Sequence, residues 1–452
     1  MNLSGRGVCR CDLAVVGTGM AGMSSALFAL NRGLSVAQVG TYGESIFASG
    51  LIDLLGVHPI GDRKEWENPW DGISTLVRDI PKHPYAHLCK EDMRAAFEEL
   101  VSFLQGAGVD YRIAGDRNVK VLTPLGTSKS TYGIPETMWA GVKALERKDP
   151  CLLVDFEGYT EFSARQIAES LSKRWKGLET LRLRFPESGT GGELSPLQMA
   201  QALEKPSRCD ALAQAIRAAA GPARSVGLPA ILGIYNSRRI HSDLEKAIGI
   251  PVFEILTLPP SAPGMRLLEA FSAGLGRRSV KGFYQSRVVS ARQESGGGFL
   301  LDLQNPHSNS RIRCRGVVLA TGRFLGKGLA ADRRRIRETV FDLPVVQPGS
   351  REGWHREDFF DPGGHPVNRA GLETDGFFRP VDDSGTPVYE RLFAAGSILA
   401  HQDWMRMKCG SGLAVTSAYG AVKGFIEVAG LKKRKNVQCR MSNVQFPRGR
   451  KK

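Results

Sequence analysis

The chain has 452 residues, of which 42% are hydrophobic, so it can bury a large core and form two or three structural units. Its eight cysteines show no CxxC pair and no spacing typical of a zinc or iron–sulfur site. We therefore expect no metal centre and a location in the reducing cytoplasm. No run of 18 apolar residues occurs, so membrane association is expected only at the periphery or through a partner.

The formal net charge of +15 is concentrated at the C-terminus, where the last 21 residues carry nine Lys and Arg side chains and no acid. We favour a solvated, partly disordered basic tail at residues 433–452; the alternative is attraction to anionic lipid or to an acidic partner. Phe446 is the only aromatic residue of this tail, whereas a single-stranded nucleic acid stacks on several rings. We therefore expect no nucleic-acid partner.

The first predicted element is a strand, turn, helix and strand at residues 13–39. The apolar strand at 13–16 leads into a GxGxxG turn formed by Gly17, Gly19 and Gly22. In dinucleotide-binding units the first glycine permits the tight turn, the second lets the backbone approach a phosphate, and the third lets helix and strand pack closely. The pattern predicts a nucleotide cofactor near the N-terminus.

One position of this fingerprint departs from the usual pattern. Gly40 stands where an acidic residue would bind the ribose of adenosine, and Glu44 is the only acid close by. Either Glu44 or backbone groups hold the ribose, or the cofactor has no adenosine half.

The next region predicts an inserted lobe. Residues 152–156 and 181–185 are typical of strands, residues 163–175 of a helix, and residues 222–235 of a further strand or loop. We expect this insert to form an α+β cap over the cofactor. Residues 286–320 then predict a β-hairpin whose turn is the glycine run at 296–298.

Three later segments, at residues 315–322, 391–397 and 409–420, resemble in that order the flavoprotein fold with two dinucleotide-binding domains. A helix beginning near Ser411 would direct its positive end at the flavin edge where negative charge collects on reduction. The expected cofactor contacts in these segments are at Thr321, Gly322, Gly396, Ser397, Gly410, Ser411 and Gly412.

The predicted fold is therefore α/β, a discontinuous FAD/NAD(P)-binding Rossmann-like flavoprotein fold with an inserted cap. We expect the flavin-binding domain at residues 8–60, 265–330 and 388–432, and a cap or partner region at 61–264 and 331–387.

The sequence resembles the B subunit of anaerobic glycerol-3-phosphate dehydrogenase from about residue 12 to residue 428. The motifs that carry this resemblance, besides the three segments above, lie at residues 47–55, 83–85, 122–126 with 130–131, and 256–261 with 264–267. Ser49 and Gly50 belong to the first motif and follow the nucleotide unit where a flavoprotein loop passes the cofactor, so both are further expected cofactor contacts.

The resemblance implies a cytoplasmic subunit, peripheral to the inner face of the cell membrane through its partners. It implies oxidation of glycerol 3-phosphate to dihydroxyacetone phosphate, beside an FAD-containing A subunit and a membrane-associated iron–sulfur C subunit that passes electrons to quinone. It also implies FMN in this chain, with which Gly40 agrees, as does Ser397 in place of the usual aspartate; FAD is the alternative.

Catalytic residues are harder to predict, since alcohol oxidation needs a base for the hydroxyl proton and cations for the phosphate. His58, His401, Arg266 and Arg323 are weak candidates, and His83 and His365 also lie in segments that could approach the flavin. For each, a structural or surface role is the favoured alternative. The run Arg333–Arg337 could equally flank the flavin or face a partner or solvent.

Two further hypotheses remain open from the sequence. The chain could be a non-catalytic relay or structural subunit, or an RNA-directed flavoprotein that holds its substrate with the basic tail.

Overall fold

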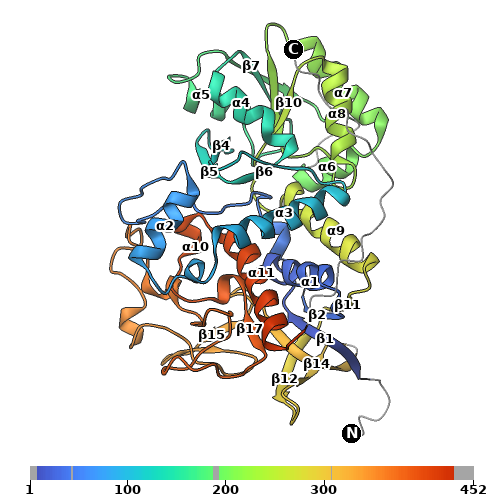
Figure 1. Ribbon diagram of the computed structural model, residues 1–452. Coiled ribbons are helices and arrows are strands. Elements are labelled where there is room, and N and C mark those ends of the chain that lie inside the picture. The colour runs from blue at the N-terminus through green and yellow to red at the C-terminus, as the bar shows by residue number, and fades with distance from the viewer. Residues whose placement is uncertain (1–7, 42–43, 187–192, 307, 432–452) are drawn as a thin grey trace, which may run out of the picture.

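A computed structural model describes residues 8–41, 44–186, 193–306 and 308–431 (Figure 1). The basic tail predicted at 433–452 lies outside these residues. The described chain forms two lobes, one above the other in Figure 1, and each contains its own β-sheet.

The lower lobe is built on a seven-stranded sheet. Its strands in spatial order are β11 (Lys281–Tyr284), β2 (Val36–Gly40), β1 (Cys9–Val16), β14 (Asn309–Leu319), β13 (Phe299–Gln304) and β12 (Arg287–Gln293), with β17 (Leu392–Ala394) also paired to β14. The pairs β11–β2, β2–β1, β1–β14 and β14–β17 are parallel, whereas β12, β13 and β14 are antiparallel. The structure thus confirms the Rossmann-like sheet, and the hairpin expected at 286–320 is present.

On the side facing the upper lobe, α1 (Met20–Asn31) and α11 (Gly410–Val428) pack against the sheet, and α3 (Lys90–Gly106) and α9 (Ala262–Arg277) pack against these two helices (Figure 1). Nearly all of α1 is apolar or small and buried, because it packs against the sheet, α11 and α9 at once. The first and last helices of the described chain therefore lie side by side.

The upper lobe contains a four-stranded sheet in the order β10 (Val252–Ile255), β9 (Ser225–Pro229), β7 (Cys151–Phe156) and β8 (Leu178–Leu183). All three pairings in it are parallel. Its helices are α4 (Trp139–Arg147), α5 (Ala164–Leu171), α6 (Pro196–Ala202), α7 (Pro206–Ala219) and α8 (Ser237–Ile248). The inserted lobe is present as expected. Its strands alternate with helices and form a parallel sheet, so it is of the α/β type and not α+β.

Shorter hairpins and helices lie outside the two main sheets. They are β3 (Tyr111–Ile113) with β6 (Gly133–Pro135), β4 (Val119–Leu122) with β5 (Ser128–Thr131), and β15 (Leu329–Ala331) with β16 (Ile336–Glu338), together with α2 (Pro69–Asp79) and α10 (Trp404–Met407). Met93, Phe97 and Leu100 of α3 lie in the core of the larger sheet, whereas a second core spans residues 122–255. The domain boundaries expected from the sequence stay a prediction.

Candidate cofactor site

The glycine turn after β1 is shaped by close backbone packing. Gly17 has a φ of +133°, and a Cβ atom there would lie 2.1 Å from the carbonyl oxygen of Ala320. A Cβ atom on Gly22 would lie 2.1 Å from the carbonyl oxygen of Gly17. The buried side chain of Gln38 also holds this turn, since its Nε2 donates to the same Gly17 oxygen over 3.0 Å. Both glycines are therefore required for the turn itself.

Gly19 differs from its two neighbours in the motif. It is the N-cap residue of α1, no side chain caps the helix, and a Cβ atom on Gly19 would meet nothing within 4 Å. The first N–H groups of a helix lack partners within the helix and carry partial positive charge. This open helix start fits a phosphate group.

The end of β2 leaves little room for a side chain at position 40. A Cβ atom on Gly40 would lie 2.9 Å from Cγ2 of Thr18, whose hydroxyl donates to the carbonyl of Thr41 over 2.7 Å. A side chain long enough to bind a ribose could enter this position only if Thr18 moved. The side chain of Glu44 lies outside the described part of the structure.

Two of the later glycine segments do meet the first turn. A Cβ atom on Gly396, which has a φ of +82°, would lie 2.6 Å from Cβ of Ala21, and one on Gly322 would lie 3.6 Å from Oγ of Ser397. The N–H of Gly396 donates to Oγ of Ser417 in α11 over 2.9 Å. The ends of β1, β14 and β17 thus form one continuous rim.

A buried polar atom without a partner lies on this rim. Oγ1 of Thr321 is buried and makes no hydrogen bond among the described residues. Leaving such a hydroxyl unpaired costs about 1–3 kcal/mol, so a bound group that pairs with it would be stabilised there. The open start of α1 and this hydroxyl together fit a flavin nucleotide.

Residues of β3 and of the start of α9 hold the loop that carries Ser49 and Gly50. Gly50 has a φ of +79°, and a Cβ atom there would lie 2.4 Å from Cβ of Pro263 at the start of α9. The hydroxyl of Tyr111 donates to the Gly50 carbonyl over 2.6 Å, and that of Ser261 donates to the Ala48 carbonyl over 2.6 Å. These contacts from β3 and the start of α9 therefore fix the position of the loop.

The start of α11 binds the same loop. Oγ of Ser411 accepts the N–H of Asp53 over 2.7 Å and donates to the Leu51 carbonyl over 3.1 Å, while the N–H of Gly412 donates to the Asp53 carbonyl over 2.8 Å. The Ser411 hydroxyl, predicted to contact the cofactor, is thus engaged within the chain. Its contacts fix residues 51–53 at the end of the helix.

An ion pair that sequence reasoning missed lies beside this helix start. Nζ of Lys129, from β5, is 2.7 Å from Oδ2 of Asp53, and Oδ1 of Asp53 is buried with no partner in the described chain. Asp53 lies within the motif at 47–55, and Lys129 directly precedes the motif at 130–131. Their positions in those motifs were the available signal.

Arg323 has a structural role, because its side chain holds several backbone carbonyls together. Its guanidinium donates to the carbonyls of Ser397 and Gln402 over 2.7 and 2.9 Å, and also to those of Asn368 and Leu399. Burial lowers the pKa of Arg323 to about 10, because the charged form is taken out of water. Its donors face the chain's own carbonyls.

Arg266 is also fully engaged. The side chain is 2% exposed and its two terminal nitrogens lie 2.6 and 2.7 Å from the carboxylate of Glu254, while Nε donates to the Gly233 carbonyl over 2.7 Å. Burial raises the pKa of Glu254, but Arg266 and hydrogen bonds from Thr137 and Leu232 outweigh it and hold that pKa below its usual value. This pair joins α9 to the upper lobe.

The histidine candidates are paired as well. His58 is buried, with Nε2 3.0 Å from Oδ2 of Asp79, and Nε2 of His401 is 3.0 Å from Oε2 of Glu373. His365 contacts backbone atoms through both ring nitrogens.

His83 is fully buried, and only one of its ring nitrogens has a partner. Nδ1 accepts the N–H of Tyr85, while Nε2 has no partner among the described residues. Burial lowers the pKa of His83 to about 3.

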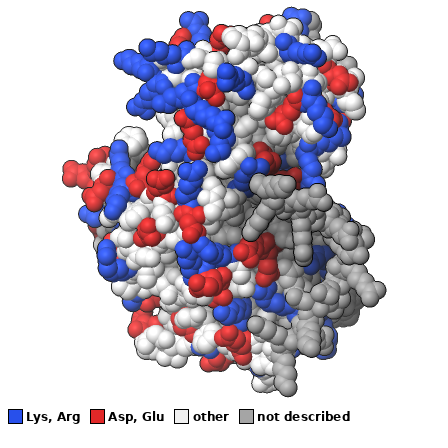
Figure 2. Space-filling model, turned by 45° about the horizontal axis from the view of Figure 1, so that its top comes forward, with Lys and Arg blue, Asp and Glu red and all other residues white. Residues whose placement is uncertain are grey.

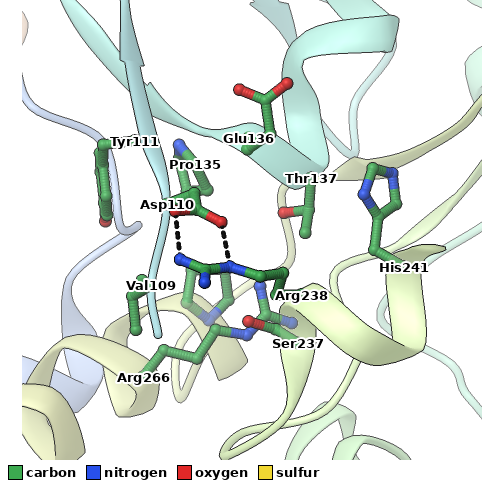
Figure 3. A pocket seen from close by; sticks show the side chains of 11 residues that line it. Val109, Asp110, Tyr111, Pro135, Glu136, Thr137, Ser237, Arg238, His241 and Arg266 are labelled. Carbon is green, nitrogen blue, oxygen red and sulfur yellow. Dashed lines mark hydrogen bonds and ion pairs between the residues drawn. The ribbon is translucent and has the colours of Figure 1, made fainter. Parts of the chain in front are cut away.

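A hollow lies at the junction of the lobes, and no residue of the glycine turns lines it (Figure 3). Arg238 of α8 reaches across it to the carboxylate of Asp110, and the side chains of Thr137, His241 and Arg266 form its inner wall (Figure 3). The charged groups that line it already have ion-pair partners within the chain.

The charged surface is uneven. Figure 2 shows Lys and Arg gathered on one side of the upper lobe, whereas both signs are interspersed below. The arginines of the run at 333–337 are exposed around the β15–β16 hairpin, where Asp332 accepts backbone N–H groups and pairs with Arg337 over 3.8 Å. Within the described residues, no helix has the length and apolar character that crossing a membrane requires.

The sequence matches the FAD binding domain family over residues 12–413. That match spans most of the chain and agrees with the Rossmann-like sheet and the open glycine turn, so the protein is a flavin-binding oxidoreductase of this class.

Within the class, the chain belongs to the family formed by the B subunits of anaerobic glycerol-3-phosphate dehydrogenase. It is 31% identical over 425 residues to the probable B subunit from Halobacterium salinarum, covering 91% of this chain and 96% of that protein. It is 29% identical over 437 residues to the B subunit from Aliivibrio fischeri, covering 92% and 95%. The resemblance drawn from the motifs is thereby confirmed.

A solved structure of 3-ketosteroid delta1-dehydrogenase from Sterolibacterium denitrificans aligns with 94% of this chain and 100% of its own, at 13% identity and a TM-score of 0.43. This likeness is too slight to bear on function.

Proposed function

We propose that this chain is a flavin-containing subunit of an anaerobic glycerol-3-phosphate dehydrogenase complex. The complex would oxidise sn-glycerol 3-phosphate to dihydroxyacetone phosphate and pass electrons through an iron–sulfur C subunit to membrane quinone, with an FAD-containing A subunit as further partner. The names of its relatives support this assignment. The observation that carries flavin binding is the open start of α1 at Gly19, together with the buried hydroxyl of Thr321, which has no partner among the described residues.

We propose FMN as the cofactor, with FAD as the alternative. Thr18 lies against Gly40 at the position where FAD sites place a ribose-binding acid, which favours a flavin without adenosine. The phosphate would lie against the N–H groups at the start of α1, and Thr321 and Ser397 would hydrogen-bond the ribityl chain.

When bound, a flavin accepts a hydride equivalent from a substrate carbon and can release electrons singly. This chain's own contribution would be to orient the ring and exclude water: residues 49–53 form a wall held by Tyr111, Ser261 and Ser411. The positive end of α11 lies behind that wall and favours negative charge near it.

A relay subunit that does not itself oxidise substrate is the second candidate. The engagement of Arg323, Arg266, His58 and His401 in internal contacts favours it, because each would have to give up a partner to serve a substrate. Catalytic roles for these four residues stay predictions, as does a cytoplasmic site at the inner face of the membrane.

The testing experiment is to purify the chain alone and with its A and C subunits, denature it, and identify the released flavin by chromatography. FMN from this chain is expected. Release of FAD would overturn the choice of cofactor, and a colourless chain would overturn a flavin role. Adding glycerol 3-phosphate to the isolated yellow chain then separates the two candidates, since bleaching of its flavin excludes a pure relay.

A further inference from the structure

Exposed large apolar side chains are concentrated in one part of the lower lobe. Six of the fourteen such residues in the described chain fall within three short segments. They are Phe324 and Leu325, Phe359 and Phe360, and Trp404 and Met405, with exposed fractions of 42%, 78%, 75%, 80%, 37% and 58%. We call these six residues the apolar patch.

The three segments are tied to one another by polar contacts. Arg323, directly before Phe324, donates to the carbonyl of Gln402, two residues before Trp404. Asp403 accepts from Nδ2 of Asn368 over 3.3 Å, and Gly364 packs against it. The ring of Phe359 lies 6.1 Å from that of His365, next to Gly364. These contacts bring the three segments together around α10, which lies in the lower lobe (Figure 1).

The six side chains together expose a large apolar area. Large side chains of this kind offer about 150–250 Å² each, so the exposed fractions correspond to roughly 700 Å². The largest apolar patch on a typical monomer covers about 300–600 Å², and each side of a standard protein interface covers about 800 Å². The combined exposed area of the six side chains is thus comparable to one side of a standard interface.

Its location adjoins the predicted cofactor. Phe324 follows the Thr321–Gly322 turn after one residue, and the same Arg323 that links the segments also binds the carbonyl of Ser397. Trp404 also packs against Gly410 at the start of α11, where a Cβ atom would lie 2.8 Å from its ring. A protein seated on the patch would therefore lie near the wall of residues 49–53, against which the flavin ring is proposed to lie.

We propose that the apolar patch is the docking surface for the iron–sulfur C subunit of the proposed complex, which would accept electrons from this chain. The proposal rests on the proposed function, because the occupant is chosen for its nearness to the flavin. The occupant would present an apolar surface of comparable area.

The test uses the full chain purified with its A and C subunits. A Phe359→Ser/Phe360→Ser variant and a Leu325→Ser variant each lose exposed apolar surface and little core packing. Val289→Ser, on β12 and 54% exposed, is the matched control outside the patch. Affinity for each partner is measured by biolayer interferometry, and flavin content by absorbance.

We expect both patch variants to bind the accepting subunit at least tenfold more weakly, with the control unchanged and flavin content kept in all three. Equal binding by all variants overturns the proposal, and so does a wild-type chain that binds neither subunit. If the chain alone dimerises and only the patch variants lose the dimer, the occupant is a second copy and the proposal fails. Flavin content reports on the proposed function separately, since a colourless chain can still bind its partner.

Discussion

Gly19 and Gly22 lie three residues apart in one turn, yet the space around them differs. A methyl group on Gly22 would collide with the Gly17 carbonyl, whereas one on Gly19 would enter open space. We expect Gly22→Ala to lower the free energy of unfolding by about 1–3 kcal/mol. Gly19→Ala should change it by less than about 1 kcal/mol but weaken flavin binding at least tenfold.

Urea unfolding of the apoprotein and fluorescence titration with FMN and FAD check this pair of variants. If Gly19→Ala left both flavin affinities unchanged, the open start of α1 would not be the phosphate site.

His83 makes stability depend on pH. Its pKa is about 3 in the folded chain because burial disfavours the charged ring, with His58, His401 and His87 nearby adding repulsion, and about 6.5 in the unfolded chain. The unfolded state therefore binds the extra proton between these values, so stability falls as pH drops below about 6.5 and is unaffected above it. His83→Asn keeps an acceptor for the Tyr85 N–H and removes this titration.

We expect the loss of unfolding free energy between pH 7.5 and pH 5 to be smaller by about 2 kcal/mol in His83→Asn, measured by urea denaturation. The exposed His355→Asn should show the wild-type pH dependence, and an identical slope in both variants would contradict the assignment.

The sequence predicted these residues unevenly. The glycine turn was predictable because its chemistry lies within six residues, from Gly17 to Gly22. The roles of Arg323 and Ser411 were not, because their partners lie 45 to 79 residues away for the first and 358 to 360 for the second. An arginine after a turn shows its charge in the sequence, but not the carbonyls that will surround it.

At the scale of elements, the buried pair of Arg266 and Glu254 joins α9 to β10 across the lobes. Removing one partner leaves a buried charge unpaired, so we expect Arg266→Met or Glu254→Gln each to cost about 3–5 kcal/mol. The double variant should cost at least about 1.5 kcal/mol less than the sum of the two single variants.

A cycle of urea unfolding measurements on the four proteins gives this coupling energy. Arg182 and Asp155 supply the matched comparison, because the Arg182 side chain is 59% exposed and its pair should couple more weakly. Additive losses for Arg266 and Glu254 would mean that the pair does not act as a unit.

Element prediction was most accurate where local pattern decides. The strands at 152–156 and 181–185 are present, as β7 and β8, with bounds that differ by at most three residues. The parallel arrangement of the upper sheet was missed, although every residue of β7 is buried. A continuous apolar strand covered on both faces is typical of parallel sheets and was the signal available.

For the whole molecule, the contact between Ser411 and residues 51–53 closes the site from the two ends of the described chain. Ser411→Ala would leave the Asp53 N–H and the Leu51 carbonyl without that hydroxyl, so we expect a loss of about 1–3 kcal/mol and weaker flavin retention. Thr416→Val in the same helix is the control, since its hydroxyl donates only to the Gly412 carbonyl of its own helix.

Thermal unfolding with and without added flavin measures both effects. Should Ser411→Ala retain its flavin as the wild type does, residues 51–53 would not form a wall of the site.

The pairing of β1 with β14 also has a consequence for synthesis of the chain. Residues 9–16 find their central neighbour only when residues 309–319 have left the ribosome. At about 5–20 residues per second, that interval is roughly 15–60 s, during which the first strands have an unpaired edge. The edge of β1 is therefore without this neighbour through most of the synthesis of the chain, an exposure that favours aggregation in large proteins.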